Sequence, residues 1–149
     1  PLTIIKSFIN KSPTTVLRDD GWLEINVDMD PSLVEKRTRA KMLTYREKNL
    51  PCYKYSDSRK KSLMQLVQRL NHNGEVFLVR LPIHPDMMTI ENEMLPFFND
   101  SIKDVIAISS GYLDLTAENT SHTYTDGNHL HKSSCEVVSR KVAYWIKNQ

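Results

Sequence analysis

Apolar residues in the second half of the chain recur first at helical and then at strand spacing. Four of them lie three or four residues apart between positions 56 and 70, which predicts an amphipathic helix. These positions are Leu63, Leu66, Val67 and Leu70. Asn71-His72-Asn73-Gly74 then ends the helix. The continuous apolar run 76–81 is typical of a strand buried in a parallel sheet.

The same alternation continues toward the C-terminus. Residues 87–98 predict a helix interrupted at Pro96, and residues 102–109 predict a further helix that ends at Gly111. The inward positions expected for these two helices are Met88, Met94, Leu95, Phe98, Ile102, Val105, Ile106 and Ser109. A short strand, 112–115, follows, then a polar loop. The capping box Ser133-Ser134-Cys135-Glu136 opens a last helix. Its apolar stripe is Val138, Val142, Trp145 and Ile146.

Helices that alternate with buried strands predict the α/β class. We expect a flavodoxin-like three-layer α/β/α fold with a mostly parallel sheet, in a single domain 1–149 that is incomplete at its N-terminus. Residues 56–149 form its α/β core, and residues 1–55 are more irregular, helical and basic. Right-handed crossovers would bring the loop 82–86 toward the loop 116–131.

The N-terminal part shows shorter patterns. Helical spacing of apolar residues predicts a short helix that stops at Ser12-Pro13. Asp19-Asp20-Gly21 predicts a turn, and the alternating run 22–27 an exposed strand. Asp30-Pro31 caps a basic helix that runs to Asn49 and is broken at Leu50-Pro51-Cys52-Tyr53.

Composition narrows the class of protein. The chain has 149 residues, of which 40% are hydrophobic and 26% charged, as in ordinary soluble domains. It contains no apolar run long enough to span a membrane and no signal peptide, so we expect a cytoplasmic protein. Cys52 and Cys135 have neither disulfide-framework nor metal-ligand spacing, which agrees with a reducing compartment.

Charge is unevenly distributed although the net charge is only +2. Residues 28–61 hold ten Lys or Arg against five Asp or Glu, and residues 82–126 hold one against eight. The basic helix could meet phosphates or present a solvated face. Because it lacks interleaved aromatic residues and the net charge is small, we expect no nucleic-acid partner.

The candidate chemistry lies in the turn 124–130, where Asp126 and His129 stand three residues apart around Gly127. An Asp that accepts a hydrogen bond from one ring nitrogen of a His leaves the other nitrogen free to take a proton from a nucleophile. The turn follows a strand and precedes a helix, which is where open α/β sheets place their sites.

Near its C-terminus the chain has, in order, a strand, a polar loop, Asp126-Gly127-Asn128-His129-Leu130 and a terminal amphipathic helix ending in Tyr144-Trp145-Ile146. This order resembles the last conserved block of SGNH (GDSL-type) serine hydrolases and acyltransferases. The likeness covers roughly residues 62–149. It implies that Asp126 orients His129, that His129 is the general base, and that the substrate is a small-molecule or carbohydrate ester.

Two further residues are candidate substrate contacts. His84 lies in the stiff loop Pro82-Ile83-His84-Pro85-Asp86 that directly follows the strand 76–81, and Asn128 lies within the turn itself. No motif indicates a cofactor.

The chain departs from the family in its nucleophile. None of its four glycines opens a Gly-Asp-Ser or Gly-x-Asn-Asp motif. Ser56-Asp57-Ser58 lacks the Gly and predicts a helix cap, whereas Phe98-Asn99-Asp100 falls in a helical region. We therefore expect the nucleophilic Ser and the oxyanion hole to come from a segment before Pro1, and the 149 residues alone to hydrolyse esters poorly.

Three alternatives stay open. The chain could be a non-catalytic binding module of the same fold, or Asp126 could merely cap a turn beside a solvated His129. It could also bind a metal ion through a cluster of nitrogen and oxygen ligands. That cluster comprises His122, Asp126, His129 and His131. Loss of strands from a doubly wound sheet would expose apolar edges, so self-association is a further expectation.

Overall fold

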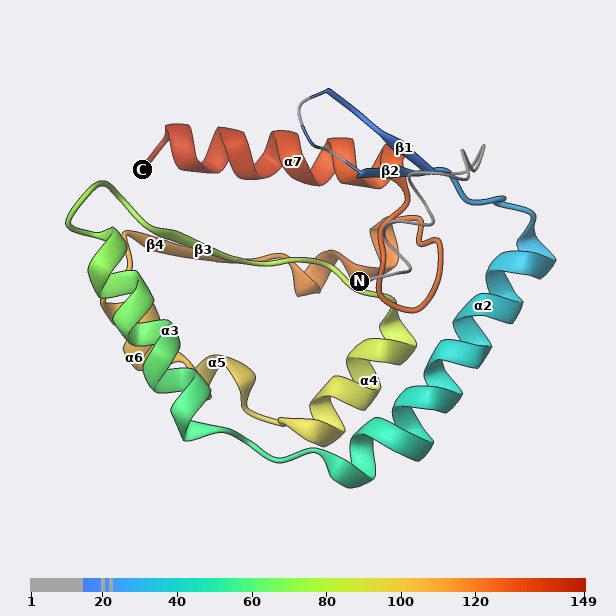
Figure 1. The fold of residues 1–149 in the computed structure, drawn as a ribbon, viewed down its shortest axis with the longest axis horizontal. Helices are drawn as coiled ribbons and strands as arrows, with labels where there is room; N and C mark the ends of the chain where they lie inside the picture. The colour runs from blue at the N-terminus through green and yellow to red at the C-terminus, as the bar shows by residue number, and fades with distance from the viewer. Residues whose placement is uncertain (1–14, 20, 22) are drawn as a thin grey trace.

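The computed structural model describes residues 15–19, 21 and 23–149 of a mixed α/β protein (Figure 1). In chain order its elements are β1 (Thr15–Leu17), β2 (Leu23–Ile25), α2 (Pro31–Thr44), α3 (Asp57–Leu70), β3 (Phe77–Arg80), α4 (Pro85–Met94), α5 (Phe98–Ser101), α6 (Lys103–Ala107), β4 (Gly111–Asp114) and α7 (Lys132–Lys147). Strands β1 and β2 pair antiparallel, whereas β3 and β4 pair parallel.

The parallel pair positions the rest of the molecule. Phe77 lies opposite Gly111 at its start, and Arg80 lies opposite Asp114 at its end. Figure 1 shows α7 along one face of the pair and α3 with α6 along the other. The ring of Trp145 on α7 packs edge-on against Phe77, with the ring centroids 5.4 Å apart. The predicted α/β class and the parallel pairing of these two strands are confirmed.

Helix α2 begins where its sequence predicts, but the α-helix ends at Thr44 rather than at Asn49. The Asp30 carboxylate accepts hydrogen bonds from the backbone N–H groups of Ser32 and Leu33. These two bonds satisfy donors that have no partner within the helix. After Thr44 the chain makes a π-helical turn, Tyr45–Asn49, and a 3₁₀ turn, Leu50–Cys52, before it becomes extended.

The core is smaller than the apolar pattern predicts. Its most buried side chains are Val67, Met87, Ile90, Val105, Leu115 and Val138. Two of the predicted positions on α3, Leu66 and Leu70, are 51% and 45% exposed. Among the described residues the parallel sheet is only two strands wide, so it covers part of the stripe on α3.

The inward face predicted for α4 is also wrong, because the buried positions are shifted by one residue. Met87 and Ile90 are the buried residues, while Met88 and Met94 are only half-buried. Met87 and Ile90 share one face of the helix at a spacing of three residues, and that face packs toward α2 and the turn 124–130.

Three local predictions need correction. Residues 116–121 form a 3₁₀ helix rather than a loop. Among the described residues of the strand predicted over 22–27, only Leu23–Ile25 (β2) form a strand. Helix α7 begins after His131, so Ser133 is not its cap. The neighbouring Ser134 hydroxyl instead accepts a hydrogen bond from the Thr123 N–H at 2.8 Å. The helix expected before Ser12 lies outside the described residues.

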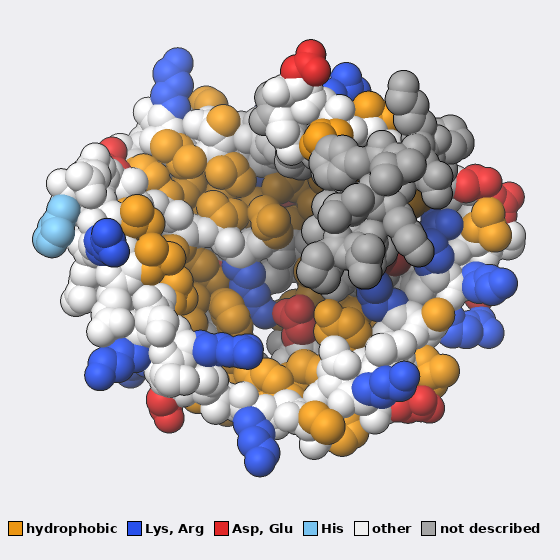
Figure 2. Space-filling view, in the orientation of Figure 1, with side chains coloured by type: hydrophobic (Ala, Val, Ile, Leu, Met, Phe, Trp, Pro, Cys, Tyr) orange, Lys and Arg blue, Asp and Glu red, His pale blue; other side chains and the backbone are white. Residues whose placement is uncertain are grey.

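Apolar side chains also reach the surface. Figure 2 shows hydrophobic side chains gathered along the sheet and α7. A shallow groove of about 350 Å³ runs between β3 and α7 there. It is lined by Val79, Leu81, Val138, Ser139, Val142, Ala143 and Ile146. Within the described part of the chain, no helix has the length and apolar character needed to cross a membrane.

The position of the core can be tested with two truncations. Ile90 is 1% exposed and Leu66 is 51% exposed. Ile90→Ala should lower the free energy of unfolding by about 2–5 kcal/mol, because it removes buried methylene groups and leaves a cavity. Leu66→Ala is the matched control and should cost less than about 1 kcal/mol. Urea denaturation measures both, and equal losses would show that the apolar stripe on α3 belongs to the core.

Candidate active site

The turn 124–130 is a closed hairpin. Tyr124 and Leu130 form an antiparallel bridge, and the Thr125 N–H donates to the His129 carbonyl at 2.9 Å. The Tyr124 side chain is buried, and its hydroxyl donates to the Asn119 carbonyl at 2.9 Å. Burial raises the pKa of Tyr124 to about 12. The hairpin is therefore anchored at its base, and its tip carries the candidate residues.

Asp126 organises the tip of the hairpin. Its Oδ1 accepts hydrogen bonds from the backbone N–H groups of Asn128 at 2.9 Å and His129 at 3.0 Å. Its Oδ2 lies 2.9 Å from Nδ1 of His129 and accepts a hydrogen bond from Nζ of Lys41 at 2.8 Å. The Asp126 side chain is only 16% exposed, whereas that of His129 is 66% exposed. The two sequence-predicted residues are thus in contact, with the imidazole toward solvent.

This contact selects one form of the neutral ring. An ionised carboxylate only accepts hydrogen bonds, so Nδ1 of His129 carries the proton that faces Asp126. Nε2 then keeps its lone pair, and within the described residues no hydrogen bond occupies it. A neutral imidazole held in this way can accept a proton from an approaching hydroxyl group.

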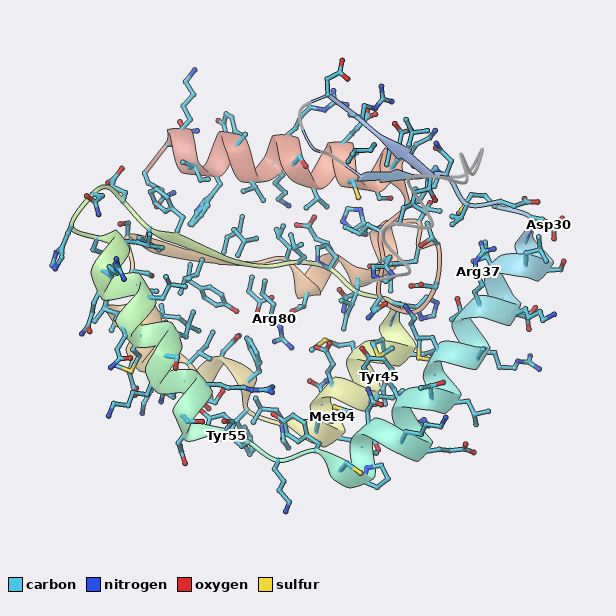
Figure 3. All side chains as sticks on the ribbon, in the orientation of Figure 1. Asp30, Arg37, Tyr45, Tyr55, Arg80 and Met94 are labelled. Atoms are coloured by element: carbon cyan, nitrogen blue, oxygen red, sulfur yellow. The ribbon has the colours of Figure 1, made fainter. Side chains whose placement is uncertain are left out.

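Helix α2 supplies a wall of the site that the sequence did not predict. Arg37 donates to the Thr125 carbonyl at 2.9 Å, and Lys41 donates to the side-chain oxygen of Asn128 at 2.8 Å. The Asn128 amide donates to the Tyr45 hydroxyl at 3.4 Å. Arg37 and Lys41 on α2 and Tyr45 just after its end are spaced by four residues, so they lie on one side of this helical segment. Figure 3 labels Arg37 on α2 and Tyr45 just beyond it.

Gly127 lets the hairpin lie close to two helices. A β-carbon at this position would stand 2.9 Å from the terminal methyl of Met42 on α2 and 3.2 Å from that of Met87 on α4. The glycine is buried, and its φ is not positive. The packing therefore requires the small size of glycine rather than a special backbone conformation.

The sequence feature that could have predicted the contact between α2 and the hairpin is charge complementarity. The basic stretch 28–61 meets the acidic stretch 82–126 in three ion pairs. They are Lys41–Asp126 at 2.8 Å, Arg46–Glu93 at 3.1 Å and Lys60–Asp104 at 2.7 Å. The solvated-face interpretation of α2 is therefore wrong for Arg37 and Lys41, which are half-buried against the hairpin.

The surroundings of Asp126 keep it ionised. Burial opposes the charge on this carboxyl group. Hydrogen bonds from Lys41, from the Asn128 N–H and from His129 outweigh that effect, and they hold the pKa of Asp126 well below its usual value.

The loop 82–86 approaches the hairpin region as the topology predicts. The Ile83 N–H donates to the side-chain oxygen of Asn119 at 3.0 Å, and the His84 ring packs edge-on against Tyr124 with the centroids 5.6 Å apart. Nδ1 of His84 accepts a hydrogen bond from the Asp86 N–H and caps α4. The structure thus gives both predicted substrate contacts a local role, because His84 caps a helix and Asn128 binds Lys41 and Tyr45.

A second polar cluster lies at the carboxyl end of the parallel pair. The Arg80 guanidinium stacks on Phe98, 4.0 Å from the ring centroid, and lies 3.6 Å from the carboxylate of Glu91 and 3.8 Å from that of Asp114. Figure 3 shows Arg80 directed to the side of the sheet opposite α7. Burial, followed by the nearby charge of Asp114, raises the pKa of Tyr112 to about 12. Two carboxylates near one half-buried cation favour a structural ion cluster over an anion site.

The metal-binding alternative gains no support from the side-chain arrangement. Across residues 15–19, 21 and 23–149, no group of three or more His, Cys, Asp or Glu is placed to hold a metal ion. His122 is buried with Nε2 3.8 Å from Glu118, and Nδ1 of His131 is paired with the Ser133 hydroxyl at 2.8 Å. Cys52 and Cys135 are both free and exposed.

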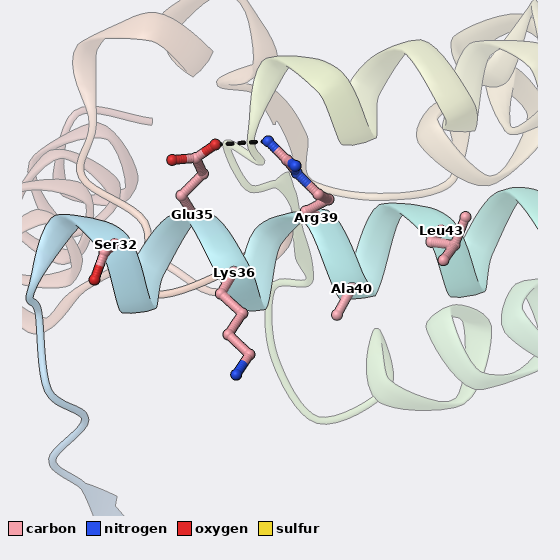
Figure 4. A pocket seen from close by; sticks show the side chains of 6 residues that line it. All are labelled: Ser32, Glu35, Lys36, Arg39, Ala40 and Leu43. Atoms are coloured by element: carbon pink, nitrogen blue, oxygen red, sulfur yellow. Dashed lines mark hydrogen bonds and ion pairs between the residues drawn. The ribbon is translucent and has the colours of Figure 1, made fainter.

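A surface depression on α2 is separate from the hairpin. Figure 4 shows its six lining residues, all on this one helix: Ser32, Glu35, Lys36, Arg39, Ala40 and Leu43. At 3.6 residues per turn, these positions face away from Lys41 and Tyr45. A single helix cannot enclose a ligand, so the contact of Asp126 with His129 remains the candidate site.

The fold and site define a mixed α/β protein with an Asp–His pair beside the carboxyl end of a parallel strand pair. Searches for similar proteins found no matching family model, no matching curated protein and no matching solved structure.

The acid stability of the chain should depend on Asp126. Its pKa is lower in the folded state than the ordinary value of 3.8, so the unfolded chain takes up the proton first as the pH falls. The stabilisation is complete above about pH 5 and is lost as the pH drops through the folded pKa. We expect the free energy of unfolding of Asp126→Asn to fall less between about pH 5 and about pH 2.5 than that of the wild type, by about 1–2 kcal/mol.

Urea denaturation at several pH values checks this expectation. Asp86→Asn, in a side chain that is 74% exposed, is the matched control and should retain the acid loss. An unchanged acid loss in Asp126→Asn would contradict the ionised, hydrogen-bonded state of this carboxyl group.

Proposed function

We propose that this chain carries the Asp and His of an SGNH-type serine esterase or O-acyltransferase, with a flavodoxin-like three-layer α/β/α fold. The observation that carries the proposal is the 2.9 Å contact between Oδ2 of Asp126 and Nδ1 of His129 on a ring that is 66% exposed. The carboxyl ends of parallel strands are where open α/β sheets bind their ligands.

The proposed reaction is acyl transfer through a covalent intermediate. Nε2 of His129 removes the proton of a serine hydroxyl while its oxygen attacks the ester carbonyl. The protonated ring then gives that proton to the departing alcohol, which leaves an acyl-serine. In the second half of the reaction, water or a sugar hydroxyl gives its proton to His129 and attacks the acyl-serine. The bond between the acyl group and the serine oxygen then breaks, and the ring returns the proton to that oxygen.

The nucleophile and the oxyanion hole are assigned to groups beyond the described residues. No serine hydroxyl between residues 23 and 149 is hydrogen-bonded to His129. In the proposal, His84 and Asn128 contact the substrate at the rim of the site. Their present bonds, to α4 and α2, would hold them in place for that role.

A second candidate function is a binding module of the same fold that performs no chemistry. It is favoured because, in the described part of the chain, no serine hydroxyl group is hydrogen-bonded to His129. The two candidates differ in whether Nε2 reacts with an acyl donor.

Reaction with p-nitrophenyl acetate distinguishes them. If Nε2 is free, it attacks the ester carbonyl, p-nitrophenolate leaves, and an acetyl-imidazole forms that water slowly hydrolyses. The proposal predicts a burst of about one p-nitrophenolate per chain followed by slow release, because the acyl group has no serine to move to. The burst should disappear in His129→Ala.

His72→Ala, which removes an exposed histidine just after α3, is the matched control and should keep the burst. An equal burst in wild type and His129→Ala would refute the proposed function and leave the binding module. Fast continuous turnover that His129→Ala abolishes would show instead that the 149 residues contain their own nucleophile.

A further inference from the structure

Lys41 makes direct contact with both members of the candidate pair. Its Nζ lies 2.8 Å from Oδ2 of Asp126, 2.8 Å from Oδ1 of Asn128 and 3.3 Å from Nδ1 of His129. The Lys41 side chain is 26% exposed, so the ammonium group is partly shielded from water. Within the described part of the chain, Lys41 is the cation that contacts the Asp126–His129 pair.

The ammonium group has a defined orientation. It carries three N–H donors and no acceptor. Two of its donors are used by Asp126 and Asn128, and Oδ2 of Asp126 accepts from Lys41 and Nδ1 of His129 together. Lys41 therefore holds in place the oxygen atom that orients the ring.

Its charge acts on the ring in the opposite sense to that of Asp126. A carboxylate beside Nδ1 favours the positively charged imidazolium, whereas a cation at 3.3 Å disfavours it. The position of Nζ therefore brings a positive charge to the same ring edge that Asp126 faces.

We propose that Lys41 is a positioning residue of the acyl-transfer site, which fixes Oδ2 of Asp126 against the His129 ring and places a positive charge beside that ring. This inference rests on the proposed function. It adds to the Asp–His pair a residue from α2, a helix distant in sequence.

Among the residues that the structure describes, the other charged groups near the hairpin do not take this role. Arg37, the other α2 cation bonded to the hairpin, donates to the backbone carbonyls of Thr125 and Asp28. Helix α4 approaches Gly127 with the methyl group of Met87. His131, at the start of α7, is paired with Ser133.

A purely structural role would make Lys41 a clamp between α2 and the hairpin. Arg37 offers the matched comparison, because it also joins α2 to the hairpin but bonds a backbone carbonyl rather than the Asp–His pair. Lys41→Met and Arg37→Met each remove one such cation and keep an unbranched side chain. Lys41→Arg restores the charge.

The test is an NMR titration of the His129 ring in the 149-residue chain, with His129→Ala to assign its signal. In Lys41→Met the titration midpoint should move up by about one pH unit, as expected for removal of a unit charge at this distance in a water-like dielectric. Lys41→Arg should restore the wild-type midpoint, and Arg37→Met should leave it unchanged. Circular dichroism verifies that each variant is folded.

The titration does not depend on acyl chemistry, so the two proposals fail separately. An unchanged midpoint in folded Lys41→Met, or an equal upward shift in Arg37→Met, would overturn the role of Lys41. Absence of the p-nitrophenolate burst together with a shifted midpoint would leave the contact of Lys41 with the ring intact and reject acyl transfer as its purpose.

Discussion

The arrangement of the site depends on the hydrogen bonds that the ionised carboxylate of Asp126 accepts. A largely buried charge is costly unless its oxygen atoms are hydrogen-bonded. Here two backbone amides, one ammonium group and one imidazole surround it. Because one side chain bonds all four, the shape of the hairpin, the orientation of His129 and the position of α2 are coupled.

That coupling explains how α2 is held. The helix contains no fully buried residue, so apolar contacts such as that of Met42 with Gly127 account for only part of its position. Polar contacts from Arg37 and Lys41, and from Tyr45 just after its end, attach one of its faces to the hairpin. A helix attached in this way contributes charge to the site as well as shape. Salt and pH should consequently affect the docking of α2 and the site together.

The hairpin is tied to the core through a short relay. Tyr124 binds the Asn119 carbonyl, and the Asn119 side chain accepts the Ile83 N–H directly after β3. Both Tyr124 and Asn119 are buried, so these polar groups are satisfied within the protein. The exposed His129 ring is therefore attached to a hairpin with a fixed base rather than to a free loop.

The sequence by itself determined the local elements. Asp30-Pro31 set the start of α2, apolar spacing located α3, β3, α6 and α7, and Asp126-Gly127-Asn128-His129 identified the pair that the structure brings into contact. These features depend on neighbours within a few residues. Only the tertiary structure decided which apolar positions are buried, and that Lys41, 85 residues from Asp126, binds it. Periodicity describes one element at a time, whereas burial and ion pairing depend on which elements meet.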